Sequence, residues 1–215
     1  MPAQPSKVSP PEKPAVLSQT QRRFLYVTAA ITGAAILIIE ILGAKMLSPY
    51  VGTSHFVWTA QIAVTLISLA IGYYFGGWLV DRSPRLSRLY FCITAAAIYL
   101  GLSVLVVGDV AYAFLSLNLA MGALVSSAVL YFIPLTLLAA VGPFLIRVLA
   151  LSFSGIGQQI GRLSAISTLG SVFGTILIGY VLIPFLPNSV TMFITAGILS
   201  AISVLYFAIW NRTKV

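Results

Sequence analysis

Residues 24–47 read FLYVTAAITGAAILIIEILGAKML, an apolar run that carries one acidic residue, Glu40. The run is long enough for a helix to cross a bilayer, since about 20 predominantly apolar residues span the hydrocarbon. A charged side chain at that depth costs about 3 kcal/mol on insertion scales and is by default a functional-site hypothesis. Two interpretations are open: Glu40 is a polar site within a helical bundle, or it only joins helices by a hydrogen bond or reaches the water interface.

The composition identifies the bilayer as the solvent of this chain. Of the 215 residues, 60% are hydrophobic and 7% are charged, whereas soluble domains carry about 25% charged residues. A backbone in hydrocarbon must satisfy its own hydrogen bonds, in helices or in a closed barrel. Continuous apolar runs of about 20 residues favour helices over alternating strands. We therefore expect an all-α membrane protein that contacts the lipid bilayer.

Six apolar stretches predict six transmembrane helices. The fourth stretch is too long for one straight crossing, and Pro134 and Pro143 each remove a backbone donor and predict a kink. The alternative is a crossing that ends near Ala140 and is followed by an interfacial helix. The expected crossings are residues 24–47, 57–80, 89–107, 119–149, 161–182 and 190–209.

The positive charges are segregated on one side of this topology. Eleven of the twelve Lys and Arg residues fall on one face, and only Lys45 lies near the other. The positive-inside rule makes the crowded face cytoplasmic, together with both termini. Because the charges are scattered between apolar spans, the net charge of +8 does not indicate a nucleic-acid partner. The eleven residues are Lys7, Lys13, Arg22, Arg23, Arg82, Arg85, Arg88, Arg147, Arg162, Arg212 and Lys214.

These patterns divide the chain into three parts. Residues 1–20 are rich in proline and predict a disordered cytoplasmic tail. Residues 21–210 form the expected six-helix domain, and residues 211–215 form a second, short cytoplasmic tail.

The supply of reactive side chains is thin. One His, one Cys and four acidic residues are a poor basis for a catalytic triad or a multi-ligand metal site. We therefore expect no catalytic residues, no cofactor and no metal, and a protein that is not an enzyme.

A dense motif closes the second apolar stretch, where residues 72–85 read GYYFGGWLVDRSPR. It resembles the signature between helices two and three of the major facilitator superfamily, Gly-x-Leu-x-Asp-Arg followed by Gly-Arg. Pro84 stands in place of the usual glycine and Leu86 in place of the usual lysine. Glycine lets helix backbones approach closely, and an Asp–Arg pair would clasp neighbouring helix ends; the alternative is a simple charged stop after a membrane helix. The matching residues are Gly77, Leu79, Asp81, Arg82 and Arg85.

A second glycine pattern lies in the fifth stretch. Gly170 and Gly174 are spaced by four residues, with Thr168 and Ser171 close by. Small residues at this spacing predict a face for close helix packing. Packing inside one bundle and a seam between two copies are both open.

Three segments carry a narrower resemblance. Residues 39–45 read IEILGAK, similar to a Tyr-Glu pattern followed by Arg, with Ile39 in place of the aromatic residue and Lys45 in place of Arg. Residues 51–58 read VGTSHFVW and lead into the glycine and Asp–Arg motif, and residues 161–187 form the third segment. Together they resemble the membrane domain that is fused ahead of a spermidine synthase-like domain in bacterial proteins.

This resemblance covers about residues 24–209 and implies one half of a major facilitator transporter in a bacterial inner membrane. Such transporters have two halves with a site between them, so a homodimer or a companion membrane protein is implied. No Gly-x-Gly-x-x-Gly follows a strand pattern. We therefore expect the synthase domain to be missing and carry no polyamine synthesis over to this chain.

The residues and the resemblance together lead us to expect a small-solute transporter. Glu40 would be the proton or cation site, Lys45 its modulating partner, and Gln61 a further polar residue on the path. A deprotonated Glu40 would hold a cationic amine, and protonation would release it. The alternative is a non-catalytic membrane scaffold that anchors or assembles with a partner protein, in which Glu40 and Lys45 form a structural pair.

Overall fold

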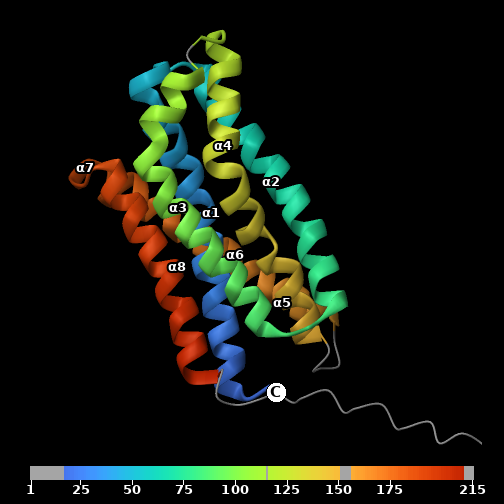
Figure 1. Cartoon of the computed structure of the whole chain (residues 1–215). Coiled ribbons are helices and arrows are strands. Elements are labelled where there is room, and N and C mark those ends of the chain that lie inside the picture. The colour runs from blue at the N-terminus through green and yellow to red at the C-terminus, as the bar shows by residue number, and fades with distance from the viewer. Residues whose placement is uncertain (1–16, 115, 151–155, 211–215) are drawn as a thin grey trace, which may run out of the picture.

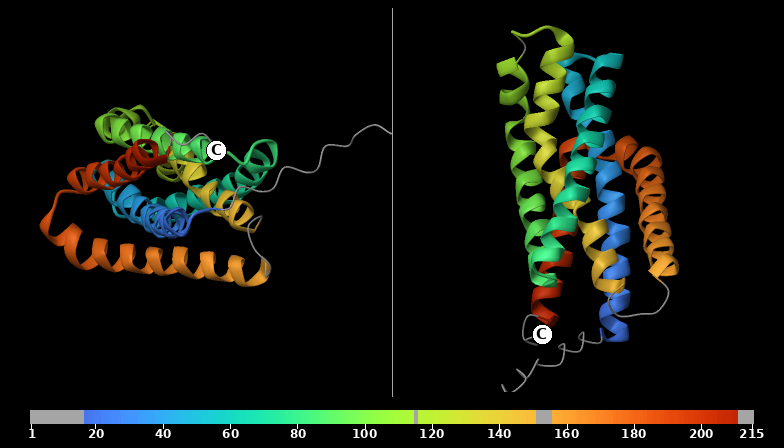
Figure 2. Two further views of the ribbon diagram at one scale, coloured as in Figure 1. Left: turned by 90° about the horizontal axis from the view of Figure 1, so that it is seen from below. Right: turned by 90° about the vertical axis from the view of Figure 1, so that its right-hand side faces the viewer.

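Long helices make up the bundle in the computed structural model, which describes residues 17–114, 116–150 and 156–210 (Figure 1, Figure 2). Within these ranges no strand occurs, and six helical stretches are long and apolar enough to cross a membrane. The expectation of an all-α protein with six such helices is thereby confirmed. The elements are α1 (Gln19–Val51), α2 (His55–Arg82), α3 (Leu86–Phe114), α4 (Leu119–Ala139), α5 (Val141–Ala150), α6 (Ile156–Leu177), the π-helix η1 (Ile178–Leu182), α7 (Ile183–Phe185) and α8 (Asn188–Trp210).

The fourth crossing bends between its two prolines. Pro134 lies inside α4 without ending it, whereas α4 gives way to α5 at Ala140. Pro143 explains the position of this break, because it offers no N–H to the carbonyl of Ala139 and its ring crowds that carbonyl. The two helices together are long and apolar enough to form one candidate crossing, Leu119–Leu149.

The first helix begins earlier than the expected boundary of the N-terminal tail. Ser18 caps α1: its hydroxyl accepts from the backbone N–H of Gln21 at 3.2 Å, and the Gln21 side chain accepts from the Ser18 N–H at 3.2 Å. This reciprocal pair satisfies two donors at the helix start. Residues 1–16 and 211–215, which hold the rest of the two predicted tails, lie outside the described residues.

The two ends of the six-helix domain meet at one end of the bundle (Figure 1). Phe24 near the start of α1 and Trp210 at the end of α8 have ring centroids 4.9 Å apart. Tyr90 of α3 stacks on Tyr206 of α8 at 3.9 Å in the same region. The described arginines lie in helix ends or turns on this side: Arg22, Arg23, Arg82, Arg85, Arg88, Arg147 and Arg162.

Close backbone contact joins α2 to α4 and α5. A Cβ added to Gly72 would collide with the carbonyl oxygen of Thr136, and one added to Gly76 with that of Ala140. Small residues allow this approach, which strengthens helix packing where hydrophobic driving force is lacking. Among the described residues nothing lies within 4 Å of a Cβ added to Gly77, so Gly72 and Gly76 are the motif glycines that make this approach. Gly77 is turned away from the contact because it is one residue, or about 100°, beyond Gly76.

A second glycine contact joins α1 to α6. A Cβ added to Gly170 would collide with the backbone of Ala30, and one added to Gly174 would lie 2.8 Å from the Cβ of Ala34. Gly170 and Gly174 therefore pack against α1 inside one bundle. Both contacts advance by four residues in the same direction, so α1 and α6 run parallel.

We predict opposite effects for alanine at the two neighbouring glycines of α2. Gly76→Ala should lower the stability by about 1–3 kcal/mol, because overpacking forces the helices apart. Gly77→Ala should be neutral or stabilising by up to about 1 kcal/mol, because alanine is the better helix former. Thermal unfolding of both variants in detergent measures the difference. Equal melting temperatures would contradict this account of the α2–α4 contact.

Candidate functional site

Glu40 lies half-buried in the second half of α1. Within the described part of the chain its carboxylate has neither a hydrogen-bond partner nor an ion-pair partner. Lys45 is exposed, and a spacing of five residues turns it about 140° away around the helix. The structure therefore does not bring Glu40 and Lys45 together, and a coupling between them stays a prediction.

The side of α1 that carries Glu40 is the side that packs on α6. A Cβ added to Gly33 would lie 2.5 Å from the backbone oxygen of Ser167 in α6, and Glu40 follows Gly33 by two helical turns. The carboxylate therefore lies beyond the Gly33–Ser167 contact, on the side of α1 that faces α6.

The π-helix has a local cause in the sequence. Pro184 follows η1 and has no N–H to donate to the carbonyl four residues earlier. The backbone instead forms a wider turn, in which the Ile183 N–H bonds to the carbonyl of Ile178. Single π-helical turns are frequent at functional sites.

Gln61 of α2 is fully buried against α1. A Cβ added to Gly43 would lie 2.8 Å from the carbon, oxygen and nitrogen of the Gln61 amide, so glycine is what admits this side chain. Gly43 follows Glu40 by three residues, which places the amide about one turn from the carboxylate along α1. Neither polar atom of the amide has a hydrogen-bond partner among the described residues. A shared polar path between Glu40 and Gln61 therefore stays a prediction.

Asp81 in the motif of residues 72–85 pairs with a residue that the sequence did not single out. The Nε atom of Arg147 in α5 lies 3.6 Å from Oδ1 of Asp81, which ties the end of α2 to α5. Arg82 instead lies over the ring of Trp78, 4.6 Å from its centroid, and Arg85 is exposed. Both members of the ion pair are largely exposed, so its contribution to stability is about 1 kcal/mol or less. The sequence did hold one signal for this ion pair, because the predicted topology places Arg147 on the same membrane face as Asp81.

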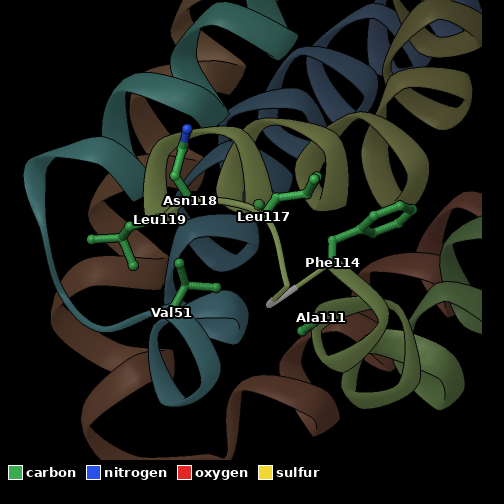
Figure 3. A pocket seen from close by; sticks show the side chains of 7 residues that line it. Val51, Ala111, Phe114, Leu117, Asn118 and Leu119 are labelled. Carbon is green, nitrogen blue, oxygen red and sulfur yellow. The ribbon is translucent and has the colours of Figure 1, made fainter.

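A small hollow opens at the end of the bundle opposite the arginines (Figure 3). Its volume is about 90 Å³, and apolar side chains form most of its wall. The Asn118 side chain accepts from the backbone N–H of Met121 at 2.9 Å and caps α4, so its oxygen is already engaged. The hollow contains no charged residue and no predicted site residue. Its lining is Val51, Ala111, Phe114, Leu117, Asn118, Leu119 and Gly122.

Neither a metal site nor a similar known protein assigns a function to these residues. Among the described residues no three His, Cys, Asp or Glu side chains gather into a group that would hold a metal ion. The chain matches no protein-family model, no curated protein and no solved structure.

Proposed function

We propose that this multi-pass membrane protein binds and moves a small cationic solute, such as an amine, at Glu40. The observation that carries the proposal is a half-buried carboxylate inside an apolar helix without a partner among the described residues. Ionisable residues in membrane helices are rare and expensive, and they mark solute or proton pathways. The cost of keeping Glu40 there is most simply offset by a ligand of opposite charge.

The proposed cycle uses the two protonation states of one side chain. Ionised Glu40 would accept charge-assisted hydrogen bonds from an ammonium group, which are stronger than neutral ones. Protonation of the carboxylate would remove the charge and release the solute. Lys45, which lies nearer the C-terminal end of α1 than Glu40, would change the electrostatic potential at the carboxylate without touching it. Gln61 would extend the polar path inward.

In our proposal the arginine-rich end faces the cytoplasm of a bacterium, and the bundle acts as one half of a major facilitator-like assembly. The support for the orientation is the gathering of described arginines at that end, in agreement with the positive-inside rule. The support for an incomplete assembly is the fifth crossing, Gly157–Phe185. Only 11% of the apolar stretch within this crossing is buried inside the structure, against 39–56% of the corresponding stretches in the other five candidate crossings.

The free side of α6 suits a second membrane helix, which favours a homodimer or a companion membrane protein. Gly157, Gly161, Ala165 and Thr168 are exposed and recur at helical spacing, away from the α1-facing side. Nothing lies within 4 Å of a Cβ added to Gly157 or Gly161. Small residues of this kind form helix–helix contacts in membranes. The same face would serve the alternative function, a scaffold that assembles with a partner protein without transporting.

Spermidine binding tests the role of Glu40. We predict that Glu40→Gln weakens binding of radiolabelled spermidine by about tenfold or more, because a hydrogen bond to a charged group is worth about 1.5–3 kcal/mol. Asp109→Asn, which removes an exposed acid in α3, is the matched control and should bind as the wild type does. Binding to purified protein and uptake into proteoliposomes are both measured. Equal binding by Glu40→Gln would refute the cation site, and binding without uptake would favour the scaffold.

The mass in mild detergent tests the α6 face. We predict a dimer that Gly161→Leu converts to a monomer, because a large side chain would hold the second helix away. Gly197→Leu in α8 is the control, since that glycine is also exposed with nothing within 4 Å of its added Cβ. A wild-type monomer, or equal masses for the two variants, would exclude this face as the seam.

A further inference from the structure

Helix α2 lies at one edge of the bundle, and the described residues leave one side of it uncovered (Figure 1, Figure 2). It contacts α1, α4 and α5, and Gly72 and Gly76 mark the side that packs on α4. Trp78 follows Gly76 by two residues, or about 200°, and therefore lies on the opposite side of the helix. We define the α2 stripe as the exposed residues that recur at helical spacing on that side: Ile71, Tyr74, Trp78 and Arg82.

The α2 stripe changes from apolar to aromatic to cationic as it approaches the arginine-rich end of the bundle. Arg82 follows Ile71 by eleven residues, so the two lie about 16 Å apart along the helix axis. This is close to half of the hydrocarbon thickness, about 15 Å. Tyr74 and Trp78 lie between them, and such aromatic residues favour the boundary between hydrocarbon and headgroups. A phospholipid along the stripe would place its acyl chain on Ile71 and its phosphate at Arg82.

An aromatic ring holds the guanidinium of Arg82. The central guanidinium carbon lies 4.6 Å from the centroid of the Trp78 ring, and this ring stacks in turn on Phe75 at 6.0 Å. A guanidinium has five N–H donors in its plane, and their geometry matches two oxygens of a phosphate. Contact with the face of a ring uses none of these donors. Arg82 is therefore held in position and still able to bind an anion.

The acidic residue beside Arg82 is already engaged, because Asp81 pairs with Arg147 of α5 at 3.6 Å. Within the described ranges none of Arg82, Arg85 and Arg88 has an acidic partner. The link between α2 and α3 is three residues long and can reach about 10 Å at most. The N–H of Arg88 donates to the carbonyl of Arg85 at 3.0 Å, which closes a turn there. Three positive charges without an acidic partner are thus concentrated at the end of the α2 stripe.

We propose that the α2 stripe and the turn after it bind an anionic phospholipid of the leaflet at the arginine-rich end. A zwitterionic headgroup fits less well, because its cation would approach three positive charges. A free phosphate would leave the exposed aromatic and apolar part of the stripe without a partner. Each arginine near an anionic membrane surface strengthens binding about fivefold. The site is separate from Glu40 and from the exposed face of α6, so it does not depend on the proposed transport.

Quenching of tryptophan fluorescence by brominated lipids measures the lipid preference beside Trp78. Trp58→Phe and Trp210→Phe leave Trp78 as the one tryptophan of the chain. The purified protein is placed in phosphatidylcholine vesicles that contain a small fraction of phosphatidylglycerol or phosphatidylcholine brominated near the glycerol end of the acyl chain. Bromine quenches a ring that its lipid touches, so the two quenching curves give the relative affinity. We expect phosphatidylglycerol to bind beside Trp78 about fivefold or more tightly than phosphatidylcholine.

The other end of the same helix supplies the matched control. Trp58 lies in the first turns of α2 and is 37% exposed, close to the 44% of Trp78. A variant that keeps Trp58 as its one tryptophan should show no preference between the two lipids. A preference at Trp58 equal to that at Trp78 would overturn the proposal, because it would belong to the whole surface of the protein.

Two arginine variants assign the preference to this site. Arg82→Gln should remove most of the preference at Trp78, and comparing both lipids within one variant cancels any change in the brightness of the ring. Arg162→Gln is the matched control, since Arg162 also lies over an aromatic ring, 5.1 Å from the centroid of Tyr26, and it should keep the full preference.

Three outcomes would contradict the assignment. The absence of a preference at Trp78 would overturn the proposal. An equal loss in Arg82→Gln and Arg162→Gln would also overturn it, because diffuse charge would then select the lipid. Relief of the phosphatidylglycerol quenching by excess soluble glycerol phosphate would assign the site to a free anion and overturn the lipid as its occupant.

Discussion

A polar group inside hydrocarbon has no solvent to pair with, and this constraint governs the whole bundle. Backbone groups meet it by forming helices. Most buried hydroxyls meet it by bonding to a carbonyl in the preceding turn, as Thr32 does with Thr28 at 2.9 Å and Thr195 with Thr191 at 2.9 Å. Among the described residues the exceptions are Glu40, Ser54 and five buried residues of α2 and α4: Gln61, Thr65, Ser68, Ser126 and Ser127. For Glu40, whose charge makes an unpaired position most costly, a ligand is the physical explanation that we favour.

The helix contacts explain how these exceptions are held in place. Two glycine contacts, α2 against α4 and α1 against α6, set the spacing of the parallel helices. A third glycine, Gly43, admits the Gln61 amide between α1 and α2. Each contact depends on a missing side chain, so a single added carbon at Gly72, Gly76 or Gly170 would disturb it. The glycine contacts that pack the helices therefore also hold the polar side chains in their positions.

The crossings were predictable because run length and proline position act locally along the chain. The break at Ala140 follows from Pro143, and the Gly170–Gly174 face was recognisable from its spacing. Contacts across helices were not predictable in the same way. The sequence offers two adjacent glycines, Gly76 and Gly77, and only the helix orientation decides which one meets α4. Likewise Glu40 and Lys45 are close in number but far apart around α1.

The most direct test of the central claim asks whether water reaches the position of Glu40 inside the membrane. Glu40→Cys would be placed in a Cys92→Ser background, which removes the chain's one cysteine, and treated in proteoliposomes with a small, water-soluble cationic thiol reagent. Ile39→Cys, at the same depth but 0% exposed, and Leu102→Cys, on an exposed apolar face of α3, are the controls. The account predicts that position 40 reacts faster than both and that spermidine slows the reaction. A cysteine at position 40 that is as unreactive as the controls would contradict it.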